Sequence, residues 1–376
     1  MGRMTRQPII VGAGAAGLAV AACLKQGGLD PLVLDKAPRL GGGWRHHYDR
    51  LVLHTSRGRS GLPGMAMPAH YPRYPTRAQV IDYLEGYAAK FRIGPRLGAE
   101  VTRADRCGRA WAVHLGDEVI ETPHLIFATG IAMIPERPPL PGIDGFPGPA
   151  LHSSDYRNAD GFAGKRVLVV GFGNSAGDIA VDLAEGGASV EMSVRGPVNI
   201  LPKELFGIPI TSFGILRKIF PYTVADALTQ PVVRMKIGRP SDYGLQDPPK
   251  GPLSQIIEEG KIPLIDMGTL AAIKAGHIGV RPGITGIDGG RVTFADGSAQ
   301  DYDAILLATG YRQDLRPILG ALPEALDFDG RPLVSGGPSG LPGLWFCSYH
   351  VSPSGQLAQM GIEAQDIADA ILRLGG

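Results

Sequence analysis

The strongest constraint in the sequence is a pattern that occurs twice: an apolar strand, a glycine-rich loop, a helical segment and a second strand followed by a charged residue. In the first copy these parts are Pro8–Val11, the loop Gly12-Ala-Gly14-Ala-Ala-Gly17, Leu18–Lys25 and Pro31–Leu34, followed by Asp35. In the second copy they are Arg166–Val170, the loop Gly171-Phe-Gly173-Asn-Ser-Ala176, Asp178–Glu185 and Ser189–Val194, followed by Arg195. This order is typical of parallel α/β units, and the repeat predicts two of them.

Each loop has the spacing G-x-G-x-x-G or G-x-G-x-x-A. The first glycine of such a loop makes a tight turn, the second lets backbone approach a pyrophosphate, and the third small residue lets the helix pack on the strand. The helix that follows directs its free backbone amides and the positive end of its dipole at the phosphates. A single loop of this kind is weak evidence. Because strand and helix flank both loops here, we predict two dinucleotide sites.

The charged residue after the second strand distinguishes the two ligands. Asp35, with Lys36 beside it as a further cofactor contact, lies 23 residues beyond Gly12, where a carboxylate accepts a hydrogen bond from a ribose hydroxyl. Arg195 lies 24 residues beyond Gly171, where a guanidinium can bind a ribose 2′-phosphate through paired donors. The first site is therefore predicted to bind FAD or NAD, and the second NADPH.

Each half also closes in the same way, with an apolar strand that runs into a small residue, a threonine and a glycine. These exits are Ala128-Thr129-Gly130 and Ala308-Thr309-Gly310. Small residues there let the chain leave the sheet beside a bound nucleotide. We predict an α/β fold with two Rossmann-like domains, in which an NADPH domain (residues 151–302) is inserted into a discontinuous FAD domain (1–150 and 303–376). Residues 196–250 fit the second domain poorly, and are predicted to be an insertion that lines or covers a substrate channel or is structural padding.

One further helix is predicted from its start. Thr76 followed by Gln79 matches a capping box, in which side chain and backbone satisfy each other at a helix N-terminus. The apolar residues at helical spacing from Val80 to Phe91 form one stripe, which we interpret as core.

Composition excludes several other classes of protein. Lys and Arg number 37 against 36 Asp and Glu, so a formal charge of +1 gives no electrostatic footprint for nucleic acid. No apolar run reaches the roughly 18 residues of a membrane span, and Met1–Pro8 is too short and polar for a signal peptide. The three cysteines form no C-x-x-C pair, and His46, His47, His70 and His350 have no metal-ligand spacing, so neither a redox dithiol nor a metal is expected. We expect a cytoplasmic protein with reduced thiols.

A set of motifs in a fixed order resembles the flavin-containing monooxygenases. The segment from Phe146 to Tyr156 (FPGPALHSSDY) matches the F-x-G-x3-H-x3-Y fingerprint of that family, whereas the sister Baeyer–Villiger enzymes usually have tryptophan at the place of Tyr156. Further matching pieces run along nearly the whole chain: Gly42-Gly-Trp44, Tyr71–Thr76, Gly171–Ala176, Leu307–Tyr311, Gly251–Leu253 and Asp266–Leu270. Within the family, Tyr48–Leu51, Leu62-Pro63 and the last two pieces look most like the plant YUCCA enzymes, which oxidatively decarboxylate indole-3-pyruvate to indole-3-acetate.

The resemblance implies FAD and NADPH as cofactors. In the cycle that it implies, NADPH reduces FAD, NADP+ stays bound, and oxygen adds to the reduced flavin as a C4a-(hydro)peroxide that oxygenates the substrate. It places Asp35 at the FAD ribose and Gly43 and Trp44 along the flavin side of the cofactor. Asn174 and Ser175 would cap the NADPH pyrophosphate.

Two more positions take their roles from the resemblance. Gln356 and Leu357 open an apolar helix whose N-terminus, in the family, faces the flavin and stabilises negative charge on its reduced form. His54 stands where animal-type members carry an asparagine close to the oxygen-activating flavin position, as it does in the YUCCA branch. Since a histidine can donate a hydrogen bond or move a proton, His54 is the candidate catalytic residue, the alternative being a structural histidine.

Several readings stay open on the sequence alone. Within the resemblance they are oxidative decarboxylation of an aromatic 2-oxo acid and N- or S-oxygenation. Outside it they are an NADPH-dependent flavin reductase or oxidase and a non-enzymatic flavin-binding redox sensor. The missing C-x-x-C argues against a thioredoxin-reductase type, and the complete NADPH half argues against a sensor. The expected partners are a small-molecule substrate and molecular oxygen, without nucleic acid or membrane, and a homodimer is left open.

Overall fold

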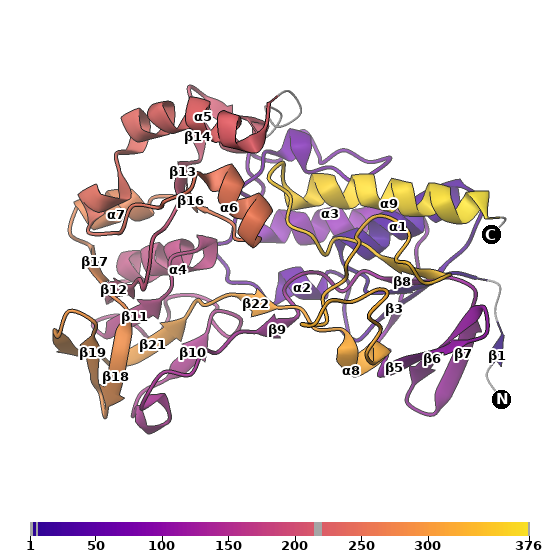
Figure 1. The fold of residues 1–376 in the computed structure, drawn as a ribbon, viewed down its shortest axis with the longest axis horizontal. Helices are drawn as coiled ribbons and strands as arrows, with labels where there is room; N and C mark the ends of the chain where they lie inside the picture. The colour runs from indigo at the N-terminus through magenta and orange to yellow at the C-terminus, as the bar shows by residue number, and fades with distance from the viewer. Residues whose placement is uncertain (1–2, 5–6, 214–219, 375–376) are drawn as a thin grey trace. The chain divides into compact units, whose positions relative to one another are not determined.

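The computed structural model describes residues 3–4, 7–213 and 220–374, which form two compact units (Figure 1). Unit 1 comprises residues 1–45, 55–134 and 311–376, and unit 2 comprises residues 46–54 and 135–310. Each unit contains one of the two glycine loops and its own parallel sheet, so the predicted α/β class with two Rossmann-like halves is confirmed. The expected boundaries at 150/151 and 302/303 both fall within unit 2, and residues 46–54, expected in the first domain, also belong to unit 2.

Unit 1 is built on a five-stranded parallel sheet. In spatial order its strands are β23 (Leu344–Phe346), β8 (Leu125–Phe127), β2 (Ile9–Val11), β3 (Leu32–Asp35) and β4 (Arg96–Leu97). All three residues of β2 are buried, because both faces of this sheet are covered and a central parallel strand must then be apolar throughout.

Helices cover one face of this sheet. The helices of unit 1 are α1 (Ala15–Gln26), α2 (Gly42–Arg45), η1 (Arg57–Arg59), α3 (Arg77–Lys90), α8 (Arg316–Leu319) and α9 (Gln356–Arg373). Helices α1, α3 and α9 lie side by side (Figure 1), and α1 is buried from Ala15 to Leu24 because it packs against α9. The predicted capping box at Thr76 is confirmed, since its side chain accepts from the Gln79 amide while the Gln79 side chain accepts from the Thr76 amide.

A second, four-stranded sheet covers the other face. It contains β1 (Arg3–Met4), β7 (Glu118–Thr122), β6 (Ala110–Leu115) and β5 (Arg103–Cys107). Its side chains Trp111 and Val113 join Ile9, Val11 and Leu125 of the parallel sheet in one hydrophobic core. The parallel sheet is therefore sandwiched, and the carboxyl ends of its strands are left as the edge where loops can form a site.

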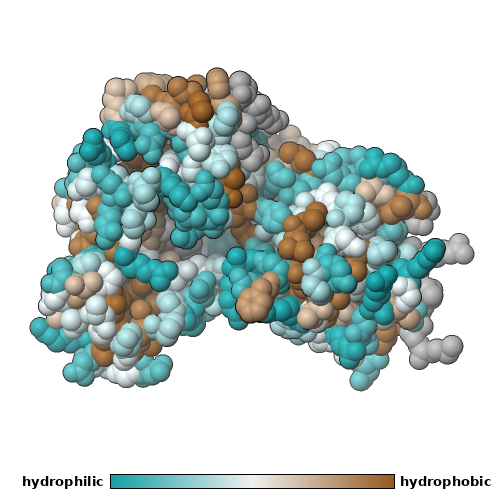
Figure 2. Space-filling model, viewed as in Figure 1, coloured by the Kyte–Doolittle hydropathy of each residue, from teal (hydrophilic) through white to brown (hydrophobic). Residues whose placement is uncertain are grey.

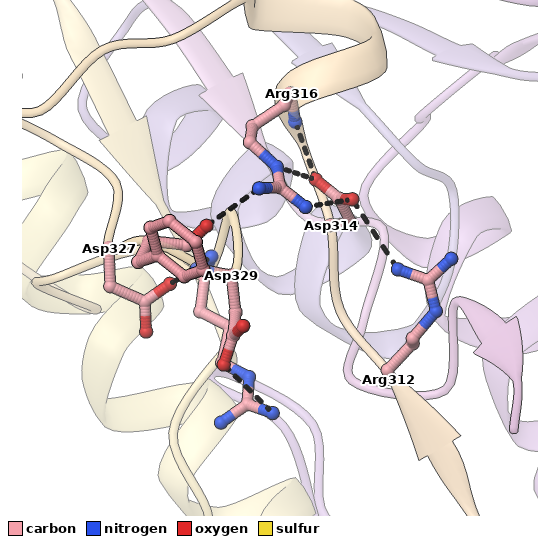
Figure 3. A network of polar contacts seen from close by, with 7 residues as sticks. Arg312, Asp314, Arg316, Asp327 and Asp329 are labelled. Carbon is pink, nitrogen blue, oxygen red and sulfur yellow. Dashed lines mark hydrogen bonds and ion pairs between the residues drawn. The ribbon is translucent and has the colours of Figure 1, made fainter. Parts of the chain in front are cut away.

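A charged network fixes the loop that leads into α8 (Figure 3). The guanidinium of Arg316 binds both carboxylate oxygens of Asp314, with Nε to Oδ1 at 2.8 Å and Nη2 to Oδ2 at 2.7 Å, and Arg312 approaches the same carboxylate at 3.4 Å. Asp314 is buried, and its bonds with Arg316 lower its pKa to about 2. A third Arg316 nitrogen donates to the carbonyl of Phe328 at 2.6 Å, so the arginine ties the turn at Asp327–Arg331 to α8.

Unit 2 repeats the arrangement. Its five parallel strands are, in spatial order, β10 (Ala150–His152), β21 (Ala304–Leu307), β11 (Arg166–Val170), β12 (Ser189–Ser193) and β17 (Ile278–Arg281). Helices α4 (Asn174–Glu185) and α7 (Thr269–Lys274) pack on one face. The other face carries the antiparallel strands β18 (Ile284–Asp288), β19 (Arg291–Phe294) and β20 (Ala299–Asp301), with η2 (Ile143–Gly145) beside them. The chain passes between the units at β9 (Ile134–Pro135) and just before β22 (Tyr311–Arg312).

The insertion predicted at 196–250 forms a subdomain of unit 2, and residues 214–219 of it lie outside the described residues. Its elements, with the segment that follows, are β13 (Ile200–Pro202), β14 (Glu204–Leu205), β15 (Ile208–Pro209), α5 (Tyr222–Ile237), η4 (Pro240–Tyr243), α6 (Pro252–Glu259) and β16 (Leu264–Asp266). The buried carboxylate of Asp226 on α5 accepts from the amides of Leu253 and Ser254, and so joins α5 to the first turn of α6. Apolar side chains remain exposed on α5, among them Leu228 and Met235. Figure 2 shows a hydrophobic area over this helix.

Two further properties concern the described part of the chain. None of its helices is both long and apolar enough to cross a membrane. None of its His, Cys, Asp and Glu side chains gather in a group of three or more that could hold a metal ion.

Candidate functional site

The first glycine loop joins β2 to α1 in unit 1. Gly12 has a φ of +110°, and a Cβ there would lie 2.5 Å from the carbonyl oxygen of Ala128. A Cβ on Gly17 would lie 1.8 Å from the carbonyl oxygen of Gly12, so the first turn of α1 approaches the end of β2 too closely for any side chain. Gly14 is the N-cap of α1, and nothing lies within 4 Å of where its Cβ would be. The outer glycines thus make the turn, and the middle glycine keeps open the space in front of the helix.

The second loop, between β11 and α4 in unit 2, repeats this geometry. Gly171 has a φ of +120°, and a Cβ there would lie 2.5 Å from the carbonyl oxygen of Ala308. Gly173 is the N-cap of α4 and, like Gly14, has nothing within 4 Å of its Cβ position. Ala176 takes the third small position and is fully buried against the sheet.

Both loops fit the phosphates of a dinucleotide. Neither α1 nor α4 has a side-chain cap at its N-terminus, and each has 12 residues, so its first amides and its dipole are available to an anion. A side chain at Gly14 or Gly173 would fill the open space beside it, and a pyrophosphate needs that space to reach the helix amides.

The small-Thr-Gly segments, where the chain leaves each sheet, pack against the same glycine loops. Ala128 and Ala308 contact the first glycine of the loop in their own unit, so the two small-Thr-Gly segments occupy equivalent places. Thr129 hydrogen-bonds the hydroxyl of Tyr349 at 2.6 Å, and Thr309 donates to the carbonyl of Glu136. Gly130 and Gly310 both have a positive φ, which lets each exit turn away from the sheet.

The charged residues after the second strands differ in their bonding. The carboxylate of Asp35, at the end of β3, accepts from the amide of Ala13 at 2.6 Å and from that of Ala37 at 2.8 Å. Because each oxygen still has an acceptor position, Asp35 fixes the glycine loop and can also take a ribose hydroxyl. Lys36 is exposed. Arg195 follows β12, is exposed, and makes no ion pair with a carboxylate of the described residues, so its guanidinium is available to a phosphate.

The other predicted cofactor residues are placed as follows. Asn174 and Ser175 form the first turn of α4, and Asn174 uses its side-chain oxygen to accept from the amide of Ile265 on β16 at 2.7 Å. That oxygen therefore holds strand β16, which leaves the Asn174 amide nitrogen and the Ser175 hydroxyl for a ligand. Gly43 is exposed and Trp44 half-buried, both in α2.

The start of α9 is shaped by the side chain of Gln356. Its amide nitrogen donates to the Ser348 hydroxyl at 2.9 Å and to the His350 carbonyl at 3.0 Å, so Gln356 holds the loop in front of the helix. Leu357 is buried, and only its backbone amide can serve a ligand at the helix start. Gly355, with a φ of +107°, precedes the helix and packs against Thr55.

His54 belongs to unit 2, and its Nε2 faces a buried carboxylate. Its Nε2 lies 3.5 Å from Oδ2 of Asp178 on α4 and forms no hydrogen bond with any described group. The same carboxylate oxygen accepts from the hydroxyl of Tyr48 at 2.8 Å. Tyr48 and Asp178 were not predicted as site residues from the sequence. The available signal was an aspartate on the apolar face of α4, where a charge needs partners.

Residues of the F-x-G-x3-H-x3-Y fingerprint form hydrogen bonds with other parts of unit 2. His152 is fully buried and burial lowers its pKa; its Nδ1 accepts from the amide of Ser154, so Nε2 donates to the carbonyl of Gly310 at 3.0 Å. Tyr156 donates to Asp182 of α4 at 2.7 Å, and burial and that carboxylate raise its pKa well above the ordinary value. Next to it, Arg157 accepts from the amide of Asp49 through its own carbonyl at 2.8 Å. The fingerprint therefore joins the exit of β21, helix α4 and residues 46–54.

Family models match this chain on both halves. The model described as pyridine nucleotide-disulphide oxidoreductase matches residues 9–202, and the one described as flavin-binding monooxygenase-like matches residues 113–321. Indole-3-pyruvate monooxygenase YUCCA1 of Oryza sativa subsp. japonica is 40% identical over 314 residues, which cover 82% of this chain and 77% of the relative. YUCCA8 of Oryza sativa subsp. indica is 39% identical over 357 residues, covering 89% and 84%.

Solved structures share the fold. A flavin-containing monooxygenase from Stenotrophomonas maltophilia superposes with a TM-score of 0.76 at 21% identity and covers 100% of both chains. Cyclohexanone monooxygenase from Rhodococcus sp. Phi1 gives a TM-score of 0.76 at 18% identity, covering 100% of this chain and 85% of that one. The chain belongs to the flavin-binding monooxygenase-like family. The predictions of a flavoprotein monooxygenase, with FAD and NADPH as its cofactors, are thereby confirmed.

Proposed function

We propose that this enzyme oxidatively decarboxylates an aromatic 2-oxo acid of the indole-3-pyruvate type. The observation that carries the proposal is the identity of 35–40%, over 82–97% of this chain, to eight relatives that are named indole-3-pyruvate monooxygenases or probable ones. The reaction would consume one NADPH, one proton and one O2. It would place one oxygen atom in the product acid and the other in water, and release the carboxyl carbon as CO2.

We assign the flavin to unit 1 and the nicotinamide nucleotide to unit 2. The flavin, once reduced by NADPH, supplies the oxygen-activating chemistry, and the chain binds and orients both nucleotides. Gly12, Gly14 and Gly17 would hold the FAD pyrophosphate at α1, with Asp35 at its ribose. The equivalent loop in unit 2 would hold NADPH at α4, and the free guanidinium of Arg195 favours its 2′-phosphate over the plain ribose of NADH.

His54 is assigned the role of holding and moving a proton during oxygenation. An imidazole can do both near neutral pH, and the side chain is largely but not wholly buried, with 15% of its surface exposed. Partial burial shields a proton-transfer group from bulk water while leaving one edge for a reacting group.

The experiment follows both electrons and oxygen. The purified enzyme with bound FAD is reduced with NADPH without oxygen and then mixed with 18O2 and either indole-3-pyruvate, phenylpyruvate, pyruvate or an organic sulfide. We expect aromatic acids that have lost one carbon and gained one 18O, with one NADPH consumed per product. Oxygenation of the sulfide, with the 2-oxo acids left intact, would instead identify an N- or S-oxygenase. NADPH consumed with hydrogen peroxide as the sole product from every substrate would also contradict the proposal.

Two further predictions concern the setting of the enzyme. We place it in the cytoplasm, because all three cysteines are free and two of them, Cys23 and Cys347, are buried thiols with no bridging partner. The homodimer stays a prediction, which light scattering of the holoenzyme tests.

A further inference from the structure

A buried carboxylate oxygen lies between a tyrosine and the candidate catalytic histidine. Oδ2 of Asp178 is 2.8 Å from the hydroxyl of Tyr48 and 3.5 Å from Nε2 of His54. Only 6% of Asp178 and 2% of Tyr48 are exposed, so neither group is solvated as it would be at the surface. Helix α4 carries Asp178 one turn after its first residue, Asn174, which gives the carboxylate a rigid support.

The segment that carries His54 is fixed to unit 2 over its length. Tyr48 lies in the core of unit 2, and Leu51 packs against that core. The amide of Asp49 donates to the carbonyl of Arg157 at 2.8 Å, and Arg50 forms an ion pair with Glu185 at the end of α4. His54 therefore sits at a distance from Asp178 that the fold itself sets.

The other charges near this carboxylate have their own partners. Arg50 binds Glu185, and Asp182 accepts from Tyr156. No lysine or arginine of the described residues lies within ion-pair distance of Asp178. The hydrogen-bond and ion-pair contacts of Asp178 with the described residues are therefore those with Tyr48 and His54.

We propose that Asp178 is a positioning residue that fixes the proton of His54 on Nε2. An ionised carboxylate can only accept hydrogen bonds, so the nitrogen that faces it carries the proton, and Nδ1 keeps its lone pair. A ring rotation that shortens the 3.5 Å separation completes the bond. Nδ1 is then the atom that accepts and returns a proton during oxygenation. This step rests on the proposed function, in which His54 is the catalytic residue.

The first test is the 15N spectrum of the holoenzyme labelled at histidine. At a pH of about 8, above the ordinary range of histidine, the ring nitrogens of a neutral imidazole report which one is protonated. The His54 signals are identified as those that His54→Asn removes. We expect Nε2–H for His54. An Nδ1–H tautomer in the wild-type enzyme would overturn the proposal without any further variant.

The second test replaces the carboxylate by an amide. In Asp178→Asn, the amide can face the imidazole with its NH2 group or with its oxygen, so it no longer selects one tautomer of His54. The single Nε2–H signature should therefore be lost. Because positioned proton transfer contributes about 100-fold or more to a rate, product formed per NADPH consumed should fall roughly tenfold to 100-fold, with hydrogen peroxide formed instead. The rate of flavin reduction by NADPH should stay the same.

Asp182→Asn is the matched control, since Asp182 lies one turn further along α4 and likewise accepts from a tyrosine, but from Tyr156. It should keep both the His54 signature and the product yield. The proposal would be overturned if Asp178→Asn kept the signature or if Asp182→Asn lost it. It would also be overturned if Asp178→Asn lost the signature but kept the wild-type product yield. If no aromatic 2-oxo acid is oxygenated even by the wild type, the substrate assignment fails, whereas the tautomer in the wild type and the two variants still decides the role of Asp178.

Discussion

The substitution Gly173→Ala should separate nucleotide binding from folding. Gly173 has a φ of −94° and a ψ of −175°, which alanine adopts without strain, and nothing lies within 4 Å of the added methyl group. Alanine is a poorer N-cap than glycine by about 0.5–1 kcal/mol, whereas the loss of glycine's freedom in the unfolded chain returns about 0.4–1 kcal/mol. The free energy of unfolding of the protein without NADP+ should therefore change by less than about 0.5 kcal/mol.

Binding should suffer much more. The methyl group would occupy the space through which the pyrophosphate reaches the amides of α4, and hydrogen bonds to a charged group contribute about 1.5–3 kcal/mol each. The loss of one such bond raises the Kd for NADP+ by about 10- to 100-fold. At an NADP+ concentration of about 100 times the wild-type Kd, the ligand stabilises the wild type by about 2.7 kcal/mol. A 100-fold weaker variant would gain only about 0.4 kcal/mol at that concentration.

The assay is denaturant unfolding of the FAD-loaded enzyme with and without NADP+, together with a calorimetric titration. Gly171→Ala is the contrasting variant, because Gly171 has a φ of +120° and its Cβ would lie 2.5 Å from a carbonyl oxygen. It should lose about 2 kcal/mol or more of stability without any ligand present. The reasoning is refuted if Gly173→Ala binds NADP+ within twofold of the wild type, or if it unfolds as easily as Gly171→Ala.

Three further predictions test other parts of the molecule. Arg195→Ala should raise the KM for NADPH about tenfold and leave that for NADH nearly unchanged in steady-state assays; equal effects on both coenzymes would remove the basis of the assignment. Thr76→Ala should lower the free energy of unfolding by about 1 kcal/mol in urea titrations, because the amide of Gln79 loses its capping acceptor. Asp314 has a folded-state pKa of about 2, below its ordinary value of 3.8, so its contribution to stability is present above pH 3.8 and lost as the pH falls towards 2. The stability difference between wild type and Asp314→Asn should accordingly shrink over that interval, and a constant difference would contradict the ion pair with Arg316.

The glycine loops were predictable because their residues are set by contacts close in the sequence. The turn at Gly12, the close approach at Gly17 and the open N-cap at Gly14 all involve neighbouring backbone, and the spacing alone reports them. The helix starts were less well predicted: α1 begins at Ala15 instead of Leu18, and α4 at Asn174 instead of Asp178. Glycine, asparagine and serine have low helix propensity, but packing of the first turn against the strand overrides it.

The position of residues 46–54 could not be read from the sequence. Their partners in unit 2, such as Arg157 and Glu185, lie more than 100 residues away, and no local pattern reports so distant a contact. The neighbours of this segment on both sides belong to unit 1, so continuity along the chain favours unit 1, whereas the contacts of the segment place it in unit 2. The bond between Asn174 and Ile265 was not predictable for a similar reason, because the two residues are 91 positions apart in the sequence.

The fingerprint of the family acquires a physical meaning from these contacts. His152 and Tyr156 are four residues apart. His152 bonds the exit of β21 and Tyr156 bonds helix α4, and these two elements flank the second glycine loop. Burial lowers the pKa of His152, and burial beside Asp182 raises the pKa of Tyr156, so both shifts favour the neutral side chains that make these bonds. The adjoining Arg157 connects the fingerprint to the segment that carries His54, because its carbonyl accepts from the amide of Asp49. The motif need not contact a nucleotide to be typical of a nucleotide-dependent enzyme. It connects the loop that fits the phosphates to the residue assigned to proton transfer.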